Sequence, residues 1–496
     1  MIQKIIILGS GTAGLIAALS LKRSAPHLKI QIIRDPEMGV IGVGEGTTAN
    51  FPDYLFNILG IKRRKFHQLA RPTWKLGIRF LWGPRKEFYY SFGNQMEGVW
   101  RGMNMPIGYF CDEDFDDTEI QTALMRAGKA FARLPNREPN VQMNYAFHVE
   151  NEKLVASLEE IAVEWGATIT DGKMVGVDRG AGGIEAIHLA DGQRLEADFF
   201  IDASGFRSEL LGKALEEPFE SFDKTLFCDR AVIGGWDRTD EELLPFTTAE
   251  TMDSGWCWQI EHEHFINRGY VYCSDMISDD EAVEEFKRKN PKVPAAPRLL
   301  KFRSGCYRRM WVENVVAIGN SGGFVEPLEA TAIMIIVNYC QLLNEVLRDS
   351  VFQPTDSIRK FFNQMTRLRW HGIRDFLGLH YRLNTVDQTP FWKRCQIETD
   401  LSGIGDFLEF YAENGPSLLA AHQFPENVPT YGLNGHLVMM MGNKAPYRRK
   451  YKPTKHELSM LRDQRSRFRA TASKGIGVKE MLAHMNDSRW KWPDEQ

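Results

Sequence analysis

Apolar residues in the first part of the chain are grouped in the order strand, helix, strand. The run from Lys4 to Leu8 is apolar after its first residue, Leu15 to Arg23 repeats apolar residues at helical spacing, and Ile30 to Ile33 is again mostly apolar. Two short strands joined by a helix form a βαβ unit, so this pattern predicts an α/β protein with a parallel sheet.

Glycines occupy the turn between the first strand and the helix, in the run Gly9-Ser10-Gly11-Thr12-Ala13-Gly14. We expect Gly9 to make the turn, Gly11 to admit a pyrophosphate and Gly14 to let the helix pack closely on the strand. The spacing and the flanking strand and helix predict dinucleotide binding, with Thr12 and Ala13 also at the cofactor. The alternative is an ordinary glycine-rich turn that binds nothing.

The end of the second strand departs from the usual dinucleotide pattern. An acidic residue normally binds the adenosine ribose there, but this chain has Arg34 followed by Asp35. Either Asp35 takes the ribose after a small shift, or Arg34 contacts the adenine end, or Arg34 is merely solvated. We take Asp35 as the candidate cofactor residue.

Two later apolar strands also run into small residues, at Ala197 to Gly205 and at Val315 to Gly323, and Val175 to Ala190 alternates like a small sheet with a hairpin turn at Asp191-Gly192. Three strand–glycine junctions spread along one chain predict a discontinuous nucleotide-binding domain. We expect that domain at residues 1–84, 161–214 and 301–345, a sheet-containing substrate-side lobe at 85–160 and 215–300, and a mostly helical C-terminal region at 346–496.

Composition narrows the function classes. A net charge of -4 and a pI near 6.3 give no sign of a nucleic-acid or membrane partner, and no apolar run is long enough to span a bilayer. The apolar N-terminus is predicted to be a strand rather than a signal peptide. Seven scattered cysteines without a C-x-x-C pair favour free thiols in the cytoplasm and give no metal site. A homodimer is compatible with the sequence.

The stretch from Phe324 to Ile333 combines carboxylates with small residues at a predicted helix start. We expect Glu329 in the first helical turn, beside amide groups that can hold an anion. A carboxylate in this place has a second interpretation, since it can simply cap a helix, and Glu326 lies nearby.

Several motifs, taken in order, resemble one family: the flavin-dependent halogenases of the tryptophan-halogenase type, within the flavin-monooxygenase fold group. The resemblance covers residues 4 to about 395 and implies an FAD-binding, flavin-monooxygenase-like α/β fold. The motifs are Gly9 to Gly14, Ile41 to Thr47, Thr73 to Ile78, Cys228 to Ala231, Gly255 to Ile260, Phe324 to Ile333, Ile373 to Phe376 and His380-Tyr381.

The resemblance implies an oxidoreductase in which reduced FAD, O2 and a halide give hypohalous acid. That acid then reaches an aromatic substrate held away from the flavin. Lys75 is implied to engage the oxidant, and Glu329 to orient it and accept the ring proton. Thr73 to Ile78 has the pattern of a buried strand, which argues against a surface lysine.

Further residues take roles from the same resemblance. Thr331 and Ala332 correspond to the halide site, where the family commonly has Ser-Thr-Gly and this chain has Ala330-Thr331-Ala332. The flavin contacts implied are Gly44, Glu45, Gly46, Gly319, Asn320 and Ile333.

Aromatic residues mark the expected route to the substrate. Trp256 and Trp258, two apart on a strand, share one face; they correspond to a barrier between flavin and substrate or are simply core aromatics. Phe92 and Tyr90 correspond to the substrate pocket. The residues after the tryptophans, 261–264, predict an exposed charged turn. No stretch matches the segment that clamps free tryptophan, so we expect chlorination or bromination of indole or another electron-rich aromatic.

No second dinucleotide motif for a nicotinamide is present, so we expect a dissociable FAD that a separate flavin reductase supplies as FADH2. Two alternatives remain at this stage. A flavin monooxygenase would hydroxylate its substrate directly, and a flavin-binding protein without turnover would use the same glycine motifs.

Overall fold

The predicted βαβ opening is present in the computed structural model, which describes residues 1–39, 42, 44–294, 296–424, 430–487 and 489–495. Strands β1 (Lys4–Leu8) and β2 (Lys29–Arg34) pair in parallel with Ile5 opposite Ile30, and helix α1 (Thr12–Ser24) connects them. All four residues of β1 after Lys4 are buried, as expected for a strand covered on both faces.

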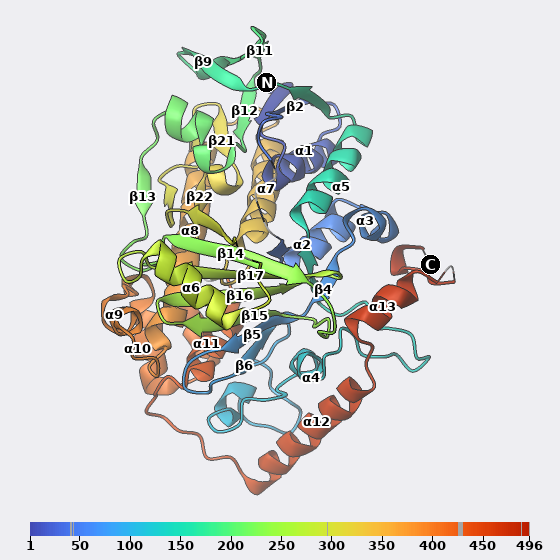
Figure 1. The fold of residues 1–496 in the computed structure, drawn as a ribbon, viewed down its shortest axis with the longest axis vertical. Helices are drawn as coiled ribbons and strands as arrows, with labels where there is room; N and C mark the ends of the chain where they lie inside the picture. The colour runs from blue at the N-terminus through green and yellow to red at the C-terminus, as the bar shows by residue number, and fades with distance from the viewer. Residues whose placement is uncertain (40–41, 43, 295, 425–429, 488, 496) are drawn as a thin grey trace. The chain divides into compact units, whose positions relative to one another are not determined.

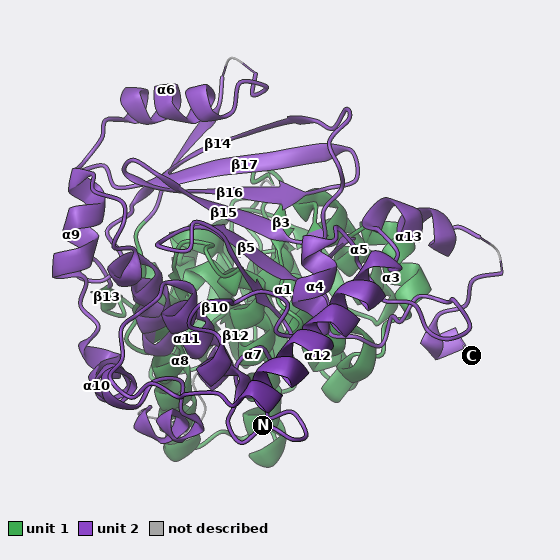
Figure 2. Ribbon diagram, turned by 90° about the horizontal axis from the view of Figure 1, so that it is seen from below, with its two compact units in different colours: residues 1–72, 149–221, 303–370 green, residues 73–148, 222–302, 371–496 purple. Residues whose placement is uncertain are grey.

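The chain folds into two compact units, coloured separately in Figure 2. Unit 1 comprises residues 1–72, 149–221 and 303–370, and unit 2 comprises residues 73–148, 222–302 and 371–496. A compact unit is not the same object as a ligand-binding domain, so the domain boundaries drawn from the sequence stay a prediction.

A six-stranded sheet organises unit 1, with the strand order β20-β21-β12-β1-β2-β8. The pairs from β21 to β8 are parallel, and β20 pairs antiparallel to β21. The three strands that precede the predicted glycine junctions, β1, β12 and β21, are neighbours, so their carboxyl ends meet at one edge of the sheet. The remaining strands are β8 (Thr168–Asp171), β12 (Phe199–Asp202), β20 (Trp311–Val312) and β21 (Val315–Ala317).

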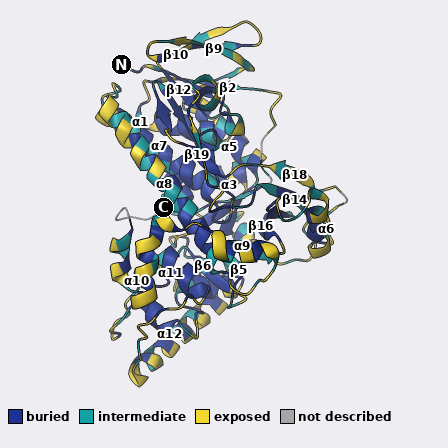
Figure 3. Ribbon diagram, turned by 90° about the vertical axis from the view of Figure 1, so that its left-hand side faces the viewer, coloured by how far each residue is buried: buried dark blue, intermediate teal, exposed yellow. Residues whose placement is uncertain are grey.

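Helix α1 packs against α5 (Asn151–Glu164) and α7 (Thr331–Asp349), as Figure 1 shows. Every residue from Gly14 to Leu21 of α1 is buried, because the helix has neighbours on several sides. Figure 3 shows much of the interior in the buried colour, with exposed stripes on helices such as α12 (Lys455–Ser473). Other helices in unit 1 are α2 (Asn50–Asp53), η1 (Tyr54–Ile58), α3 (Arg63–Ala70), η3 (Gly205–Arg207), η4 (Glu209–Ala214) and η5 (Gly319–Ser321).

Two small antiparallel sheets complete unit 1. The predicted hairpin is confirmed: β10 and β11 flank a turn that contains Asp191-Gly192, and β9 pairs with the other edge of β10. The strands of these sheets, with the short β3, are β3 (Glu45–Gly46), β9 (Met174–Gly180), β10 (Gly183–Leu189), β11 (Arg194–Glu196), β13 (Phe219–Ser221), β19 (Gly305–Tyr307) and β22 (Gly323–Phe324).

Unit 2 is built on a seven-stranded sheet with the order β18-β14-β17-β16-β15-β5-β6. The single buried strand expected around Lys75 is instead two strands that separate at Leu76. The first, β4 (Thr73–Lys75), pairs with β7 (Ala146–Val149), while β5 (Gly77–Leu81) joins the large sheet. The other strands are β6 (Phe88–Ser91), β14 (Arg230–Asp237), β15 (Thr247–Met252), β16 (Gly255–Glu261), β17 (Phe265–Tyr272) and β18 (Arg298–Lys301).

The predicted helical C-terminal region is present, and the fold class is α/β as expected. Helix α8 (Asp356–Leu383) begins in unit 1 and ends in unit 2. None of the helices in the described part of the chain is long and apolar enough to cross a membrane. The other helices in the described part of unit 2 are η2 (Ile107–Phe110), α4 (Ile120–Arg126), α6 (Asp279–Lys289), α9 (Pro390–Glu398), η6 (Ser402–Ile404), α10 (Gly405–Asn414), η7 (Leu418–Gln423), α11 (Gly432–Gly442), α12 (Lys455–Ser473), α13 (Val478–Met485) and η8 (Pro493–Glu495).

Candidate functional site

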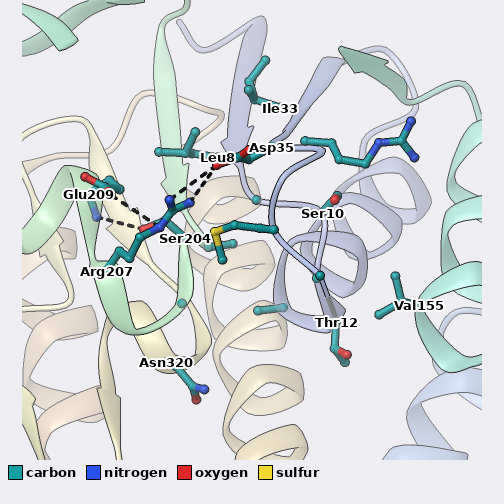
Figure 4. Close-up of a pocket in the computed structure, with 18 of the residues that line it drawn as sticks. Leu8, Ser10, Thr12, Ile33, Asp35, Val155, Ser204, Arg207, Glu209 and Asn320 are labelled. Carbon is teal, nitrogen blue, oxygen red and sulfur yellow. Dashed lines mark hydrogen bonds and ion pairs between the residues drawn. The ribbon is translucent and has the colours of Figure 1, made fainter. Parts of the chain in front are cut away.

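A cavity of about 500 Å³ opens in unit 1 where the parallel strands end (Figure 4). Its wall combines the turn after β1, the end of β2, the turn after β12 and the segment after β21. Segments far apart in sequence therefore surround one space, as expected at the carboxyl edge of a parallel sheet. The predicted cofactor residues that line it are Gly9, Gly11, Thr12, Ala13, Asp35, Glu45 and Asn320.

The three glycines of the first turn have different surroundings. Gly9 has φ +117°, and a Cβ there would lie 2.2 Å from the Ala203 carbonyl oxygen; a Cβ at Gly14 would lie 2.0 Å from the Gly9 carbonyl oxygen. A Cβ at Gly11 would meet no protein atom within 4 Å. Protein packing thus demands glycine at two positions, whereas the space at Gly11 is open to the cavity.

This geometry fits a dinucleotide cofactor. Gly11 is the N-cap of α1 and makes no side-chain cap, so the first amide groups of the helix are left for an anionic ligand. Gly319, with φ +75°, brings the turn after β21 close to the same helix, since a Cβ there would lie 2.8 Å from the Ala13 methyl group.

Arg34 and Asp35 have distinct partners. The Arg34 guanidinium donates to Asp171 at 2.6 and 3.2 Å and to Glu159 at 2.8 Å. Asp35 accepts the Glu37 amide and faces Arg207 at 3.4 Å. Arg34 is therefore held by two carboxylates at the cavity rim, and the Asp35 carboxylate is the more enclosed group, with 12% of its side chain exposed.

The second glycine motif contributes one side chain to the cavity. Asn151 donates to Glu45 Oε1 at 2.8 Å, and burial raises the pKa of this carboxyl. Gly44 and Gly46 flank Glu45 without lining the cavity. Two motif residues, Ile41 and Val43, lie outside the described residues.

The expectation that Glu329 lies in the first turn of a helix is wrong. Helix α7 begins at Thr331, and Glu329 belongs to the preceding turn, in which the Ala330 amide donates to Pro327. Ala330 has φ +55°, and this left-handed residue interrupts the helical backbone. Glu326 and Glu329 are both buried, at 0% and 3% exposure.

A second, small cavity of about 10 Å³ lies against the start of α7. Thr331 and Ala332 line it together with Gly319 and Asn320, and no acidic side chain occupies the first turn of the helix. The space is about that of one water-sized particle. Ala332 and Asn320 also line the large cavity, so the two spaces share a wall. Ile333 is buried and lines neither.

Lys75 lies in unit 2, at the end of β4, with only 1% of its surface exposed. Its ammonium is 5.7 Å from the centre of the Phe92 ring. The backbone brings them together, because the Phe92 amide donates to the Leu76 carbonyl at 2.9 Å. Lys75 is thus a buried cation beside an aromatic ring, and two residues predicted separately are neighbours.

Sequence reasoning missed His148, which lies directly opposite Thr73 in the β4–β7 pair. Its Nε2 is 2.9 Å from the Thr247 hydroxyl. Burial, followed by the charge of Lys75, holds the pKa of His148 well below its usual range, so the imidazole is neutral at physiological pH. The residues around His148 give no sign in the sequence that they pair with the strand of Lys75.

The exposed charged turn predicted at residues 261–264 is only partly correct. Strand β16 continues through Glu261, which is buried along with His262, and the Arg238 guanidinium pairs with Glu261 at 2.5 Å. The cation that allows this carboxylate to be buried, Arg238, directly follows the end of β14, so the segment itself could not reveal it.

The tryptophan pair is confirmed as a feature of one strand face. Trp256 and Trp258 are both buried on β16, with ring centres 6.0 Å apart. A Cβ at Gly269 on β17 would lie 1.9 Å from the Trp258 ring, so the absence of a side chain there makes room for the indole. Tyr90 is half-buried on β6, and its ring centre lies 6.4 Å from that of Phe376.

Comparison with known proteins gives consistent matches over nearly the whole chain. The family model described as tryptophan halogenase matches residues 4–457. The tryptophan 7-halogenases KtzQ of Kutzneria and RebH of Lentzea aerocolonigenes are each 32% identical; the alignments cover 84% and 83% of this chain and 82% of each relative. The crystal structure of MibH, a lathipeptide tryptophan 5-halogenase, is 34% identical with a TM-score of 0.89, covering 100% of this chain and 96% of that one.

Proposed function

The chain belongs to the tryptophan halogenase family and is a flavin-dependent halogenase, and we propose that it uses FADH2, O2 and chloride or bromide to halogenate an indole ring. The observation that carries the proposal is the burial of the Lys75 ammonium beside the Phe92 ring. Burying a lysine costs free energy, and buried titratable groups are concentrated at functional sites, which favours a functional role for Lys75.

The cavity of unit 1 is the proposed FAD site. Its amide groups at the start of α1 suit a diphosphate, and the open space at Gly11 admits it. Asp35 is proposed to accept hydrogen bonds from the adenosine ribose. When bound in its reduced form, FAD would supply two electrons that reduce O2 to the peroxide level, and oxygen at that level is the oxidant of the halide. Asn320 and Ile333 are proposed to lie at the flavin.

Thr331 and Ala332 are proposed to hold the halide. The first amide groups of α7 carry partial positive charge that favours a monovalent anion, and the small cavity there limits the occupant to about one particle. Alanine in place of the glycine common in the family restricts the backbone at residue 332 and bears on halide preference.

Lys75 and Glu329 are proposed to share the chemical step. The lysine ammonium donates a hydrogen bond to hypohalous acid and makes its halogen more electrophilic. The ring carbon takes the halogen while the Lys75 ammonium gives a proton to the departing hydroxide, so that water leaves, and Glu329 accepts the ring proton that is lost. Trp256 and Trp258 are proposed to keep the substrate away from the flavin.

Indole is the proposed substrate class, because Phe92 offers an aromatic face and Tyr90 a neighbouring phenol. The relatives act on tryptophan at different ring positions, and MibH acts on a lathipeptide, so the family fixes neither the ring position nor the carrier of the indole. A separate flavin reductase is the proposed source of FADH2, and a homodimer stays a prediction.

A substrate panel tests the proposal. Indole, free tryptophan, a tryptophan-containing peptide and a phenol are incubated with FAD, a flavin reductase, NADH and either chloride or bromide, and products are identified by mass spectrometry. We expect a halogen isotope pattern on indole compounds that requires halide. A hydroxylated product formed without halide would favour a monooxygenase, and tight flavin binding without any product would favour a non-catalytic protein.

A further inference from the structure

Two arginines line the flavin cavity, and their contacts with carboxylates differ in length. Arg34 is matched by Asp171 and Glu159 through hydrogen bonds of 2.6 to 3.2 Å. Arg207 has only long contacts, 3.4 and 3.5 Å from Asp35 Oδ2 and 3.4 Å from Glu209. Figure 4 shows Arg207 and Asp35 facing each other from the turns after β12 and β2.

Arg207 is also incompletely satisfied. Its Nε is buried and makes no hydrogen bond among the described residues; Glu209 Oε1 lies 3.4 Å from it, as an ion-pair neighbour without hydrogen-bond geometry. The side chain as a whole is 38% exposed. A guanidinium has five N–H donors, and a buried donor left without an acceptor is costly. Arg207 therefore retains hydrogen-bonding capacity beside the cavity.

The backbone that carries Arg207 is firmly held. Arg207 ends the short helix η3, and the next residue, Ser208, has φ +41° and donates its hydroxyl to the Ser321 carbonyl at 2.7 Å. The amides of Leu210 and Leu211 both donate to Asp202 Oδ2 at 2.8 Å. The turn is thus pinned to β12 and to the segment after β21, and the guanidinium projects from a rigid base.

The charges of the cavity wall explain why this position matters. Five acidic side chains line the cavity. Two of them, Glu159 and Asp171, form ion pairs with Arg34, and burial raises the pKa of a third, Glu45. Asp35 and Glu209 remain, and Glu209 is already paired with Lys213 at 3.1 Å. Among the described lining residues, Arg207 is the cation that faces Asp35. Without it, the Asp35 carboxylate would face a ligand whose diphosphate is itself anionic.

We propose that Arg207 is a binding residue for FAD, which neutralises Asp35 and offers its remaining donors to the anionic adenosine-diphosphate half. Its long contacts leave Asp35 able to accept the ribose hydroxyls. The inference rests on FAD being the flavin of this halogenase, and it concerns binding rather than halogenation.

Equilibrium binding tests the proposal, followed by flavin fluorescence or calorimetry without halide or substrate. Three ligands are compared: FAD, ADP, and riboflavin, which lacks any phosphate. For Arg207→Gln we expect FAD and ADP affinity to fall by about tenfold or more, the effect of one charge-assisted hydrogen bond, with riboflavin affinity unchanged. Arg207→Lys should recover part of the loss.

Arg194→Gln is the matched control, because it removes an arginine of unit 1 that already has carboxylate partners, Asp178 and Glu196, and does not line this cavity. It should change FAD affinity by less than about threefold, within the usual effect of a surface substitution. The dependence of FAD affinity on salt should also weaken in Arg207→Gln and persist in Arg194→Gln.

Unchanged FAD affinity in Arg207→Gln would overturn the proposal. An equal loss of FAD and riboflavin would also overturn it, since it would indicate a collapsed turn, which a lowered melting temperature would reveal. Halogenation is measured separately in the substrate panel, so a failure of the proposed function would leave the binding result intact, and the reverse also holds.

Discussion

The flavin cavity of unit 1 and the Lys75 region of unit 2 are built on different principles. The cavity is formed mainly by backbone atoms. Glycines at positions 9 and 14 permit close packing, and helix amides face the space. Around Lys75 the features are side chains buried on paired strands, with Phe92 and His148 brought in by neighbouring backbone.

This difference predicts which amino-acid substitutions each region tolerates. A backbone site is sensitive to any added side chain, because a Cβ occupies space that packing or the ligand needs. A site made of side chains tolerates substitutions at neighbouring positions, but it is sensitive to the loss of one functional group. The variants below either strengthen this contrast or break it.

Lys75→Ala should have the largest effect. We expect halogenation to fall by about a thousandfold or more, because the group proposed to act on the oxidant is absent. Oxygen consumption, and hypohalous acid captured by a soluble enol trap, should stay near wild type. The exposed lysine Lys393 on α9 gives the control, and Lys393→Ala should halogenate normally.

If Lys75→Ala halogenates at a near wild-type rate, the proposed mechanism is wrong. If it stops consuming oxygen, Lys75 serves the flavin step or the structure, and the contrast between the two regions fails.

Glu329→Gln should lower turnover by about a hundredfold, the usual effect of losing a positioned proton acceptor. The amide preserves shape, so folding and FAD binding should survive. Glu326→Gln is the matched variant, buried three residues earlier in the chain. A larger loss in Glu326→Gln than in Glu329→Gln would reverse the assignment, as measured by single-turnover kinetics.

Gly11→Val should reduce FAD affinity by at least about tenfold and leave thermal stability nearly unchanged, because a Cβ there meets no protein atom within 4 Å and the added methyl groups would extend into the cavity. Gly14→Ala should do the opposite and lower the melting temperature, since its Cβ would lie 2.0 Å from the Gly9 carbonyl oxygen. Equal FAD affinity in Gly11→Val and wild type, measured by titration, would remove the N-terminal turn from the cofactor site.

Phe92→Leu should have the smallest effect, raising KM for indole by about threefold to tenfold, the range of one lost aromatic contact. Phe92→Tyr keeps the ring and should stay close to wild type. Steady-state kinetics with both variants distinguishes a ring that contacts the substrate from a ring that only packs against Lys75. An unchanged KM in Phe92→Leu would place the substrate away from Phe92 and leave the ring as packing for Lys75.

Much of the fold could be predicted from local pattern. Apolar runs ending in glycines identified β1, β12 and β21, and their adjacency in one sheet confirms the discontinuous arrangement. The start of α7 was placed too early, because the left-handed conformation of Ala330 is set by its surroundings and alanine carries no sign of it. The strand around Lys75 was predicted as one, because the separation at Leu76 depends on partners elsewhere in the chain.

The features that can be read from the amino-acid sequence alone are those that depend on short-range geometry. The sequence identified the glycine turn, the buried strand of Lys75 and the shared face of Trp256 and Trp258, since each follows from residues close together in the chain.

The ion-pair partners of the charged side chains follow from the tertiary structure alone. The fold joined Arg34 to Asp171 and Glu159, placed Arg207 opposite Asp35, and buried Glu261 with Arg238. Ion pairing acts through space between residues that the chain separates by tens of positions or more. A local sequence pattern therefore shows that a charge exists, and only the fold shows what offsets it.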